Sequence, residues 1–139
     1  MIILDTNVLS ELMRGQPTAQ VVDWIAARPA ESLFTTTITQ AEVLFGVAIL
    51  PSGRKRSALQ AAVRALFDVD FAQRVLPFDA AAADAFATIA ARRQRAGRPI
   101  SQFDALIAGV ALSRDATLAT RNEGDFVGCG IDVVNPWQR

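Results

Sequence analysis

Four carboxylates along the chain stand where a parallel α/β sheet would hold a ligand. Asp5 directly follows a short apolar run at residues 2–4 that is typical of a buried strand. Glu42 and Asp104 lie in the first turns of predicted helices, and Asp125 lies in a loop beyond a later strand. Ligands of such sheets bind beyond the carboxyl ends of the strands. Because neighbouring carboxylates repel one another unless a cation neutralises them, this pattern predicts a cation site.

The composition narrows the chemistry that such a site can perform. The 139 residues include no histidine and a single cysteine, Cys129. Histidine acid–base catalysis, histidine-activated nucleophiles and zinc sites built from histidine or cysteine are therefore excluded. Oxygen ligands favour Mg²⁺ or Mn²⁺, and metal-assisted hydrolysis of a phosphodiester needs no histidine. A lone cysteine cannot form an internal disulfide, which predicts a cytoplasmic location.

Each carboxylate also has a purely structural interpretation. Asp5 could simply cap the helix that follows it. Thr39 and Glu42 stand three residues apart, as in a capping box. Asp104, three residues after a predicted N-cap at Ser101, would interact favourably with the helix dipole. The helix behind Asp104 is strongly apolar, however, and a carboxylate at the head of a buried helix is costly, which favours a functional role.

The elements that must position these side chains alternate along the sequence. Apolar and β-branched segments predict strands at residues 2–4, 32–36, 75–78, 117–120 and 131–134. Periodicity, caps and breakers predict helices at residues 7–14, 18–28, 37–50, 54–71, 79–98 and 101–112. This alternation predicts one α/β domain over residues 1–139, with a parallel sheet and helices on both faces. No apolar run is long enough to span a membrane.

Charge is balanced over the whole chain, with 14 basic and 14 acidic residues. A globally basic nucleic-acid binder is therefore not indicated. Two arginine-rich runs, residues 54–56 and 92–95, could still contact phosphates, since arginine suits bidentate contacts of this kind. Taken singly, each run is more typical of a solvated helix surface.

Five segments occur in an order that resembles a known family. They are Leu4-Asp5-Thr6-Asn7, Ala41-Glu42, Phe103-Asp104-Ala105-Leu106-Ile107-Ala108, Thr120-Arg121-Asn122 with Asp125-Phe126, and Val134-Asn135-Pro136-Trp137. Together they resemble the motifs of PIN-domain ribonucleases, in particular the VapC/FitB-type toxins of bacterial type II toxin–antitoxin systems. The likeness covers essentially the whole chain. It implies a single PIN domain over residues 1–139: a three-layer α/β sandwich with a central five-stranded parallel sheet and helices on both faces.

The resemblance also implies roles for the acidic residues. Asp5 and Asp104 become the main ligands of Mg²⁺ or Mn²⁺, and Glu42 becomes the third acidic member, binding the metal directly or through water. Many relatives have Asp where this chain has Asn122, which can offer a carbonyl oxygen but no charge. Asp125 then either compensates or only caps its loop. The catalytic set implied is Asp5, Glu42, Asp104 and Asp125.

Substrate contacts are expected from the polar residues around these carboxylates. The candidates are Thr6, Asn7, Thr120, Arg121 and Asn122. Since the acidic pocket repels a polyanion, RNA must also be held by basic groups outside it. The wider set of candidates is Arg14, Arg54, Lys55, Arg56, Arg92, Arg93, Arg95, Arg98 and Arg121. Arg121 is the strongest of them, because it adjoins the predicted metal loop.

The resemblance further implies a metal-dependent endoribonuclease that cleaves RNA phosphodiester bonds with metal-activated water and forms a homodimer. Its inhibitor would be a cognate VapB- or FitA-like antitoxin, through which a larger assembly would bind operator DNA. We expect the antitoxin to direct an Arg or Lys toward the carboxylates, where it stands in for a cation. We also expect it to bury an apolar helix in a groove between the N-terminal helices, near Leu9, Leu12 and Leu44.

A different class of function remains compatible with the residues. The chain could be a catalytically inactive α/β binding or regulatory module that keeps its carboxylates for a structural cation site. The complete trio Asp5, Glu42 and Asp104 favours the nuclease, since an inactive relative would be expected to lose one of them. A receiver-like domain fits less well, because the sequence lacks an acidic pair after the first strand and a lysine near the last.

Overall fold

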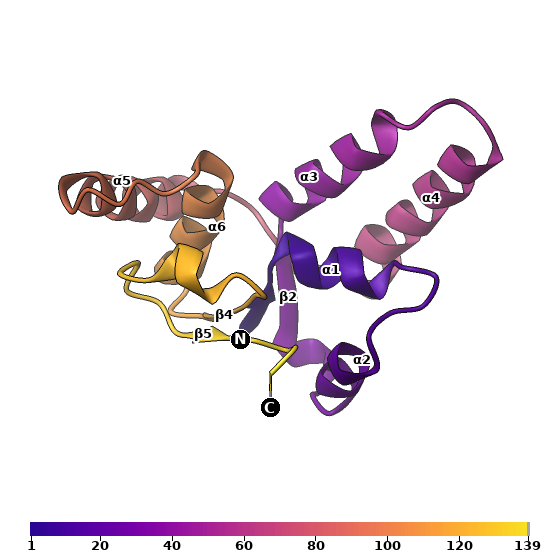
Figure 1. Cartoon of the computed structure of the whole chain (residues 1–139), viewed down its shortest axis with the longest axis horizontal. Coiled ribbons are helices and arrows are strands. Elements are labelled where there is room, and N and C mark those ends of the chain that lie inside the picture. The colour runs from indigo at the N-terminus through magenta and orange to yellow at the C-terminus, as the bar shows by residue number, and fades with distance from the viewer. Residues whose placement is uncertain (139) are drawn as a thin grey trace.

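The fold is built on a five-stranded sheet in which every strand pair is parallel, with the order β3-β2-β1-β4-β5. The computed structural model describes residues 1–138. Its strands are β1 (Ile2–Leu4), β2 (Leu33–Thr36), β3 (Val75–Leu76), β4 (Thr117–Ala119) and β5 (Val133–Val134). β1 is central and pairs with β2 on one side and with β4 on the other (Figure 1). The predicted five-stranded parallel sheet is confirmed.

Helices connect the strands. They are α1 (Thr6–Leu12), α2 (Ala19–Ala26), α3 (Thr37–Ala48), α4 (Arg54–Ala65), α5 (Ala80–Arg95) and α6 (Gln102–Ser113). Short helical turns are η1 (Ala30–Ser32), η2 (Leu66–Asp70) and η3 (Glu123–Phe126); η2 is a π-helical continuation of α4. No helix within residues 1–138 is both long and apolar enough to cross a membrane.

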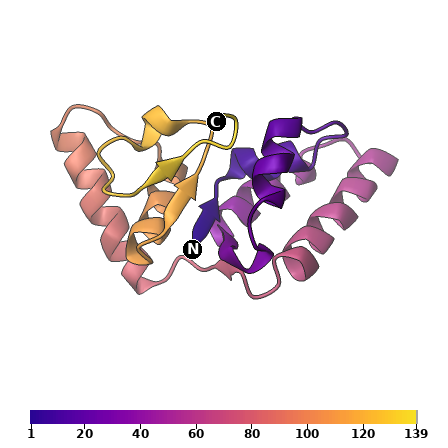
Figure 2. The same ribbon diagram turned by 90° about the horizontal axis from the view of Figure 1, so that it is seen from below.

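Alternate residues of each strand face two separate apolar cores. Ile3 and Leu118 belong to the core that α5 and α6 cover, and both are fully buried. Leu4 and Ala119 belong to the core that α1 to α4 cover, and they are also fully buried. Figure 2 shows the two groups of helices on opposite sides of the strands. Burial on both faces is the usual condition of parallel strands, and the predicted three layers are confirmed.

The order of the strands fixes where a ligand would sit. From β1 the chain continues to β2 and β3 on one side, and later returns to β4 and β5 on the other. The direction of the crossovers therefore changes between β1 and β4. In open α/β sheets, ligands bind outside the carboxyl ends of the strands at such a point. The residues that follow these two strands are Asp5 and Thr120.

Some predicted boundaries and one predicted cap are wrong. The first helix ends at Leu12 rather than at residue 14, and α5 ends at Arg95 rather than at residue 98. The capping box between Thr39 and Glu42 does not form. Instead, the hydroxyl of Thr36 caps α3 by accepting from the backbone N–H of Thr39 at 3.0 Å. The side chain of Glu42 is thereby free for another partner.

Close packing of α5 on α6 generates a test of this fold. A Cβ added at Gly109 in α6 would lie 2.8 Å from the Ala82 carbonyl oxygen and 3.0 Å from the Phe86 nitrogen, both in the backbone of α5. Gly109→Ala should therefore lower the free energy of unfolding by about 1–3 kcal/mol, because backbone atoms cannot move aside cheaply. Chemical denaturation measures the change.

Gly46 in α3 is the matched control, because a Cβ there meets no atom within 4 Å. Gly46→Ala should be neutral or should stabilise the chain by up to about 1 kcal/mol, since alanine has the higher helix propensity. Equal effects of the two substitutions would contradict the close contact between α5 and α6.

Candidate active site at the ends of the central strands

Asp5 is held rigidly at the carboxyl end of β1. Its side chain is only 4% exposed. One carboxylate oxygen accepts from the backbone N–H of Thr6 at 2.8 Å, which caps α1, and the other accepts from the Thr120 hydroxyl at 2.8 Å. The Asp5 backbone N–H donates to the Ala119 carbonyl in β4. Asp5 can therefore cap α1 and also have a functional role. The same carboxylate lies at the switch point of the sheet, which is the place between β1 and β4 where the direction of the crossovers changes.

Asn7 and Thr120 connect the start of α1 to the segment after β4. The Asn7 amide donates to the Thr120 hydroxyl oxygen at 3.1 Å, and its carbonyl oxygen accepts from the backbone N–H of Arg121 at 3.2 Å. The Thr120 oxygen also accepts from the backbone N–H of Asn122 at 3.1 Å. Thr120 is fully buried, so its hydroxyl fixes the Asp5 carboxylate and the loop at the same time.

Glu42 reaches the same region from α3. The Thr6 hydroxyl donates to a Glu42 carboxylate oxygen at 2.8 Å. The hydroxyl oxygens of Thr6 and Thr39 lie 3.0 Å apart. Since Thr6 gives its only hydroxyl proton to Glu42, the buried Thr39 is the donor in that second contact. Glu42 of α3 is therefore oriented by Thr6 of α1, whose hydroxyl oxygen in turn accepts from Thr39.

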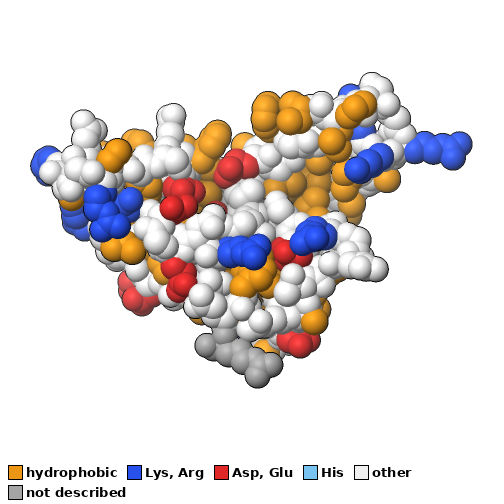
Figure 3. Space-filling view, in the orientation of Figure 1, with side chains coloured by type: hydrophobic (Ala, Val, Ile, Leu, Met, Phe, Trp, Pro, Cys, Tyr) orange, Lys and Arg blue, Asp and Glu red, His pale blue; other side chains and the backbone are white. Residues whose placement is uncertain are grey.

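Asp104 and Asp125 lie together at a neighbouring cavity. Asp104 is half-buried in the first turn of α6, where Ser101 caps the helix by accepting from its N–H at 3.3 Å. Asp125 is exposed in η3. Both line a small cavity of about 150 Å³ together with Ser101 and Arg93. On the face seen in Figure 3, acidic side chains lie between α6 and α3, next to hydrophobic surface.

The carboxylates are coupled electrostatically without forming a closed cluster. Burial raises the pKa of Asp5 from 3.8 to about 6, against the hydrogen bonds from Thr120 and Thr6, and the charges of Asp104 and Glu42 raise it further. Burial also raises the pKa of Asp104, opposed by Ser101 and Arg93 and assisted by Asp125. Within residues 1–138, no three Asp, Glu or Cys side chains stand close enough together to hold a metal ion.

The position of Arg93 differs from the expectation. The sequence suggested a surface phosphate contact, but Arg93 is only 8% exposed, and its guanidinium donates to backbone carbonyls. The spacing of the residues in the sequence could have indicated this burial, because Ala82, Ile89 and Arg93 lie on the same buried face of α5. An arginine in register with buried apolar residues indicates a buried cation rather than a solvated one.

The C-terminal segment supports the loop after β4. The side chain of buried Asn135 donates to the Arg121 carbonyl at 3.4 Å and to a Glu123 carboxylate oxygen at 3.3 Å. The Arg121 guanidinium lies over the Trp137 ring, 5.1 Å from its centre. Sequence alone identified this segment only as a motif. Its contacts show that it orients Arg121 next to the site.

An apolar surface lies beside the site on α3. Leu44, Phe45 and Ile49 are 48%, 65% and 66% exposed. A groove of about 450 Å³ runs between α3 and α4, lined by the residues Leu44, Val47, Val63 and Phe67, among others. The expected contribution of Leu9 to a docking groove is wrong, because Leu9 is fully buried in the core.

The raised pKa of Asp5 generates a prediction of how stability depends on pH. A folded-state pKa above the ordinary 3.8 means that the folded chain binds this proton more tightly than the unfolded chain. The resulting stabilisation is present below the ordinary pKa and is lost as pH rises through about 6. In a buffer that contains a metal chelator, the melting temperature of the chain should therefore rise by several degrees when the pH is lowered from about 7.5 to about 5. Asp104 acts in the same direction.

Scanning calorimetry of the wild-type chain and of Asp5→Asn measures this effect. The variant should show a distinctly weaker pH dependence. Glu11 does not cancel it: burial would raise the Glu11 pKa, but the Thr18 backbone N–H and the Arg14 guanidinium lower it below 4.5. Its stabilising contribution is thus lost only at lower pH. A melting temperature that falls on acidification from about pH 7.5 would refute the assignment of Asp5.

Comparisons with known proteins identify the family. The PIN domain matches residues 2–127. The plasmid stability protein StbB of Pseudomonas syringae pv. tomato is 42% identical over 138 residues, and the VapC ribonuclease Y4jK of Sinorhizobium fredii is 38% identical over 138 residues; each match covers 99% of both chains. A solved structure of FitAB bound to an IR36 DNA fragment contains a chain that superposes with a TM-score of 0.93 at 38% identity, covering 100% of this chain and 97% of that one. This chain therefore belongs to the PIN-domain family, in its VapC/FitB branch.

Proposed function

We propose that the chain is a divalent-metal-dependent endoribonuclease and the toxin of a toxin–antitoxin pair. The observation that carries the proposal is the buried Asp5, whose pKa is raised by burial and by the charges of Asp104 and Glu42 at the switch point of the sheet. Perturbed carboxylates that converge at such a position are typical of functional sites. The relative named a VapC ribonuclease supports RNA as the substrate.

The donor set fits a hard cation. All candidate ligands are oxygen atoms, and the chain contains no histidine to favour a softer metal. Mg²⁺ in proteins commonly binds one or two carboxylates and keeps several waters, so a closed trio of ligands is not required. Asp5 and Asp104 would hold the ion, with Glu42 acting directly or through water. A cation there would offset the burial and the repulsion that raise the Asp5 pKa.

When bound, the ion would lower the pKa of a coordinated water and neutralise charge on the phosphate. The protein supplies the orientation. Thr120 and the N–H of Thr6 fix the two oxygens of Asp5, and Thr6 fixes Glu42. We propose that Asp125 adds negative charge beside Asp104, and that Asn7, Asn122 and Arg121 line the path of the RNA.

The chain would act with partners. One structural relative was solved as FitAB bound to a DNA fragment. We propose a cognate VapB- or FitA-like antitoxin for this chain, which directs an Arg or Lys toward Asp5 and Asp104 and lays an apolar helix in the groove between α3 and α4. We also propose a homodimer, binding of the toxin–antitoxin assembly to operator DNA through the antitoxin, and action in the cytoplasm. The exposed side chains of Leu44, Phe45 and Ile49 support an apolar interface.

The acidic residues provide the first test. Asp5→Asn and Asp104→Asn should abolish cleavage of RNA while preserving the circular dichroism spectrum. Millimolar Mn²⁺ should raise the melting temperature of the wild-type chain by binding linkage, and this increase should shrink in both variants. The matched control is Asp132→Asn, which replaces an exposed carboxylate at the amino end of β5, away from the carboxyl ends of the strands where the site lies.

Cleavage at the wild-type rate by either purified variant would show that the site is wrong. A wild-type chain that responds to Mn²⁺ but cuts no RNA would support the alternative, an inactive module with a structural cation. A melting temperature indifferent to both Mg²⁺ and Mn²⁺ would rule out the metal.

Arg121 provides the second test. Arg121→Ala should weaken cleavage more than Arg54→Ala does, with Mn²⁺ affinity nearly unchanged, because Arg121 adjoins the site whereas Arg54 begins the distant α4. RNA affinity measured in Ca²⁺ should fall with salt at a slope that corresponds to roughly two to five phosphate contacts. Full activity of the Arg121 variant, or a flat salt dependence, would reject this path for the RNA.

A further inference from the structure

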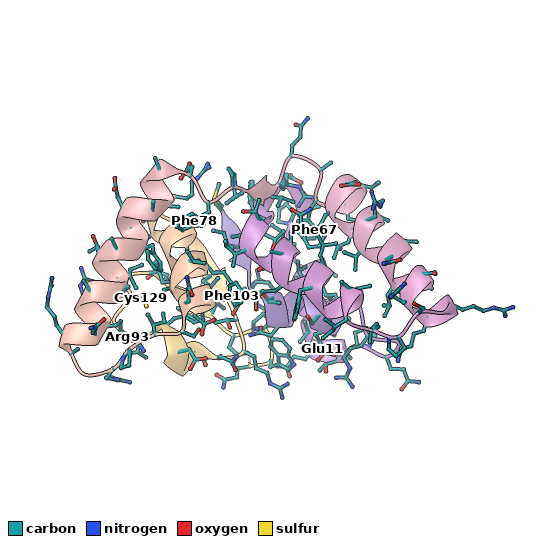
Figure 4. The ribbon with its side chains drawn as sticks, turned by 90° about the horizontal axis from the view of Figure 1, so that it is seen from above. Glu11, Phe67, Phe78, Arg93, Phe103 and Cys129 are labelled. Carbon is teal, nitrogen blue, oxygen red and sulfur yellow. The ribbon has the colours of Figure 1, made fainter. Side chains whose placement is uncertain are left out.

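Arg93 is a buried cation whose hydrogen bonds lead to two different loops. Its Nε donates to the Arg98 carbonyl at 2.7 Å. One of its terminal nitrogens donates to the carbonyls of Asp125 at 2.8 Å and Val127 at 2.9 Å, and lies 3.6 Å from the Cys129 sulfur. Figure 4 shows Arg93 and Cys129 side by side near the end of α5.

The two segments that Arg93 joins lie next to two of the candidate acidic residues. Arg98 lies in the connection from α5 to α6, shortly before the Ser101 cap and Asp104 in the first turn. Asp125 lies in η3, and Val127 directly follows the end of η3 at Phe126. Arg93, Asp104 and Asp125 line the same cavity of about 150 Å³. One guanidinium therefore links the backbone of both walls of that cavity.

An arginine at this position is not explained by packing alone. A charged group that is taken out of water costs free energy unless its donors are satisfied, and a well-packed apolar residue often serves stability as well or better. The neighbours of Arg93 on the buried face of α5, Ala82 and Ile89, are apolar. Lysine could not replace the planar fork, which here directs donors to two loops at once.

We propose that Arg93 is a positioning residue, which sets the spacing of Asp104 and Asp125 so that Asp104 can bind the divalent cation while Asp125 adds negative charge beside it. This inference rests on the proposed function, and it adds Arg93 to the residues that would organise the metal site. The guanidinium acts through the backbone of residues 98 and 125–127, and its positive charge also reduces the repulsion between the two carboxylates. Arg93 is too buried to serve as a surface contact for RNA.

Binding of Mn²⁺ by Arg93→Lys and Arg93→Met, measured by isothermal titration calorimetry, tests the proposal. Both variants should bind Mn²⁺ at least about tenfold more weakly than the wild-type chain. Amide hydrogen exchange should accelerate in residues 122–129, where the loop loses its tether. The turnover number for RNA should fall, whereas RNA affinity in Ca²⁺ should stay within about twofold, since Arg93 does not face the solvent.

Ile89→Ala is the matched control. Ile89 is fully buried one turn earlier on the same face of α5, and its truncation should lower the melting temperature without changing Mn²⁺ affinity. If the Arg93 variants lose stability as Ile89→Ala does but bind Mn²⁺ like the wild-type chain, the residue is merely structural and the proposal is overturned. If Arg93→Met does not fold, the folded Arg93→Lys variant decides. A wild-type chain that binds no Mn²⁺ would instead overturn the proposed function itself.

Discussion

The burial of the Asp5 carboxylate at the end of the central strand is the constraint on which the rest of the site depends. An ionised group with 4% exposure is costly unless hydrogen bonds and nearby charges compensate it. Thr6 and Thr120 supply hydrogen bonds but leave the Asp5 pKa raised to about 6. The fold therefore holds a carboxylate in an environment that disfavours its charge. A cation bound there, as proposed, would relieve that penalty and would link the stability of the chain to its chemistry.

Small hydroxyl and amide side chains carry much of the organisation around this carboxylate. Thr120 receives hydrogen bonds from Asn7 and from the backbone of Asn122 while it donates to Asp5. Thr6 connects α1 to Glu42 in α3. Each of these residues joins segments that are far apart in the sequence. The loss of one of these hydrogen bonds would therefore displace several polar side chains of the candidate site. Buried networks of this kind are effective only when every member is satisfied.

Positive charge enters the site in two different ways. Arg93 is buried and joins backbone segments, whereas Arg121 is exposed, lies over the Trp137 ring and has its carbonyl held by Asn135. A zero net charge is compatible with a site for a polyanion under this arrangement, because placement rather than total charge decides the local field. The C-terminal segment thus supports the loop that carries Arg121 beside the candidate site.

The sequence by itself determined the layers of the fold, the caps at Asp5 and Ser101, and the acidic residues that end strands or begin helices. These features depend on local chemistry: periodicity sets which side chains are buried, and caps satisfy backbone groups a few residues away. Only the tertiary structure decided that Glu42 bonds to Thr6, that Arg93 joins two loops, and that Asn135 supports Arg121. Such contacts join residues from 14 to 36 positions apart. No local pattern encodes them, because the partners meet only after the strands have taken their order in the sheet.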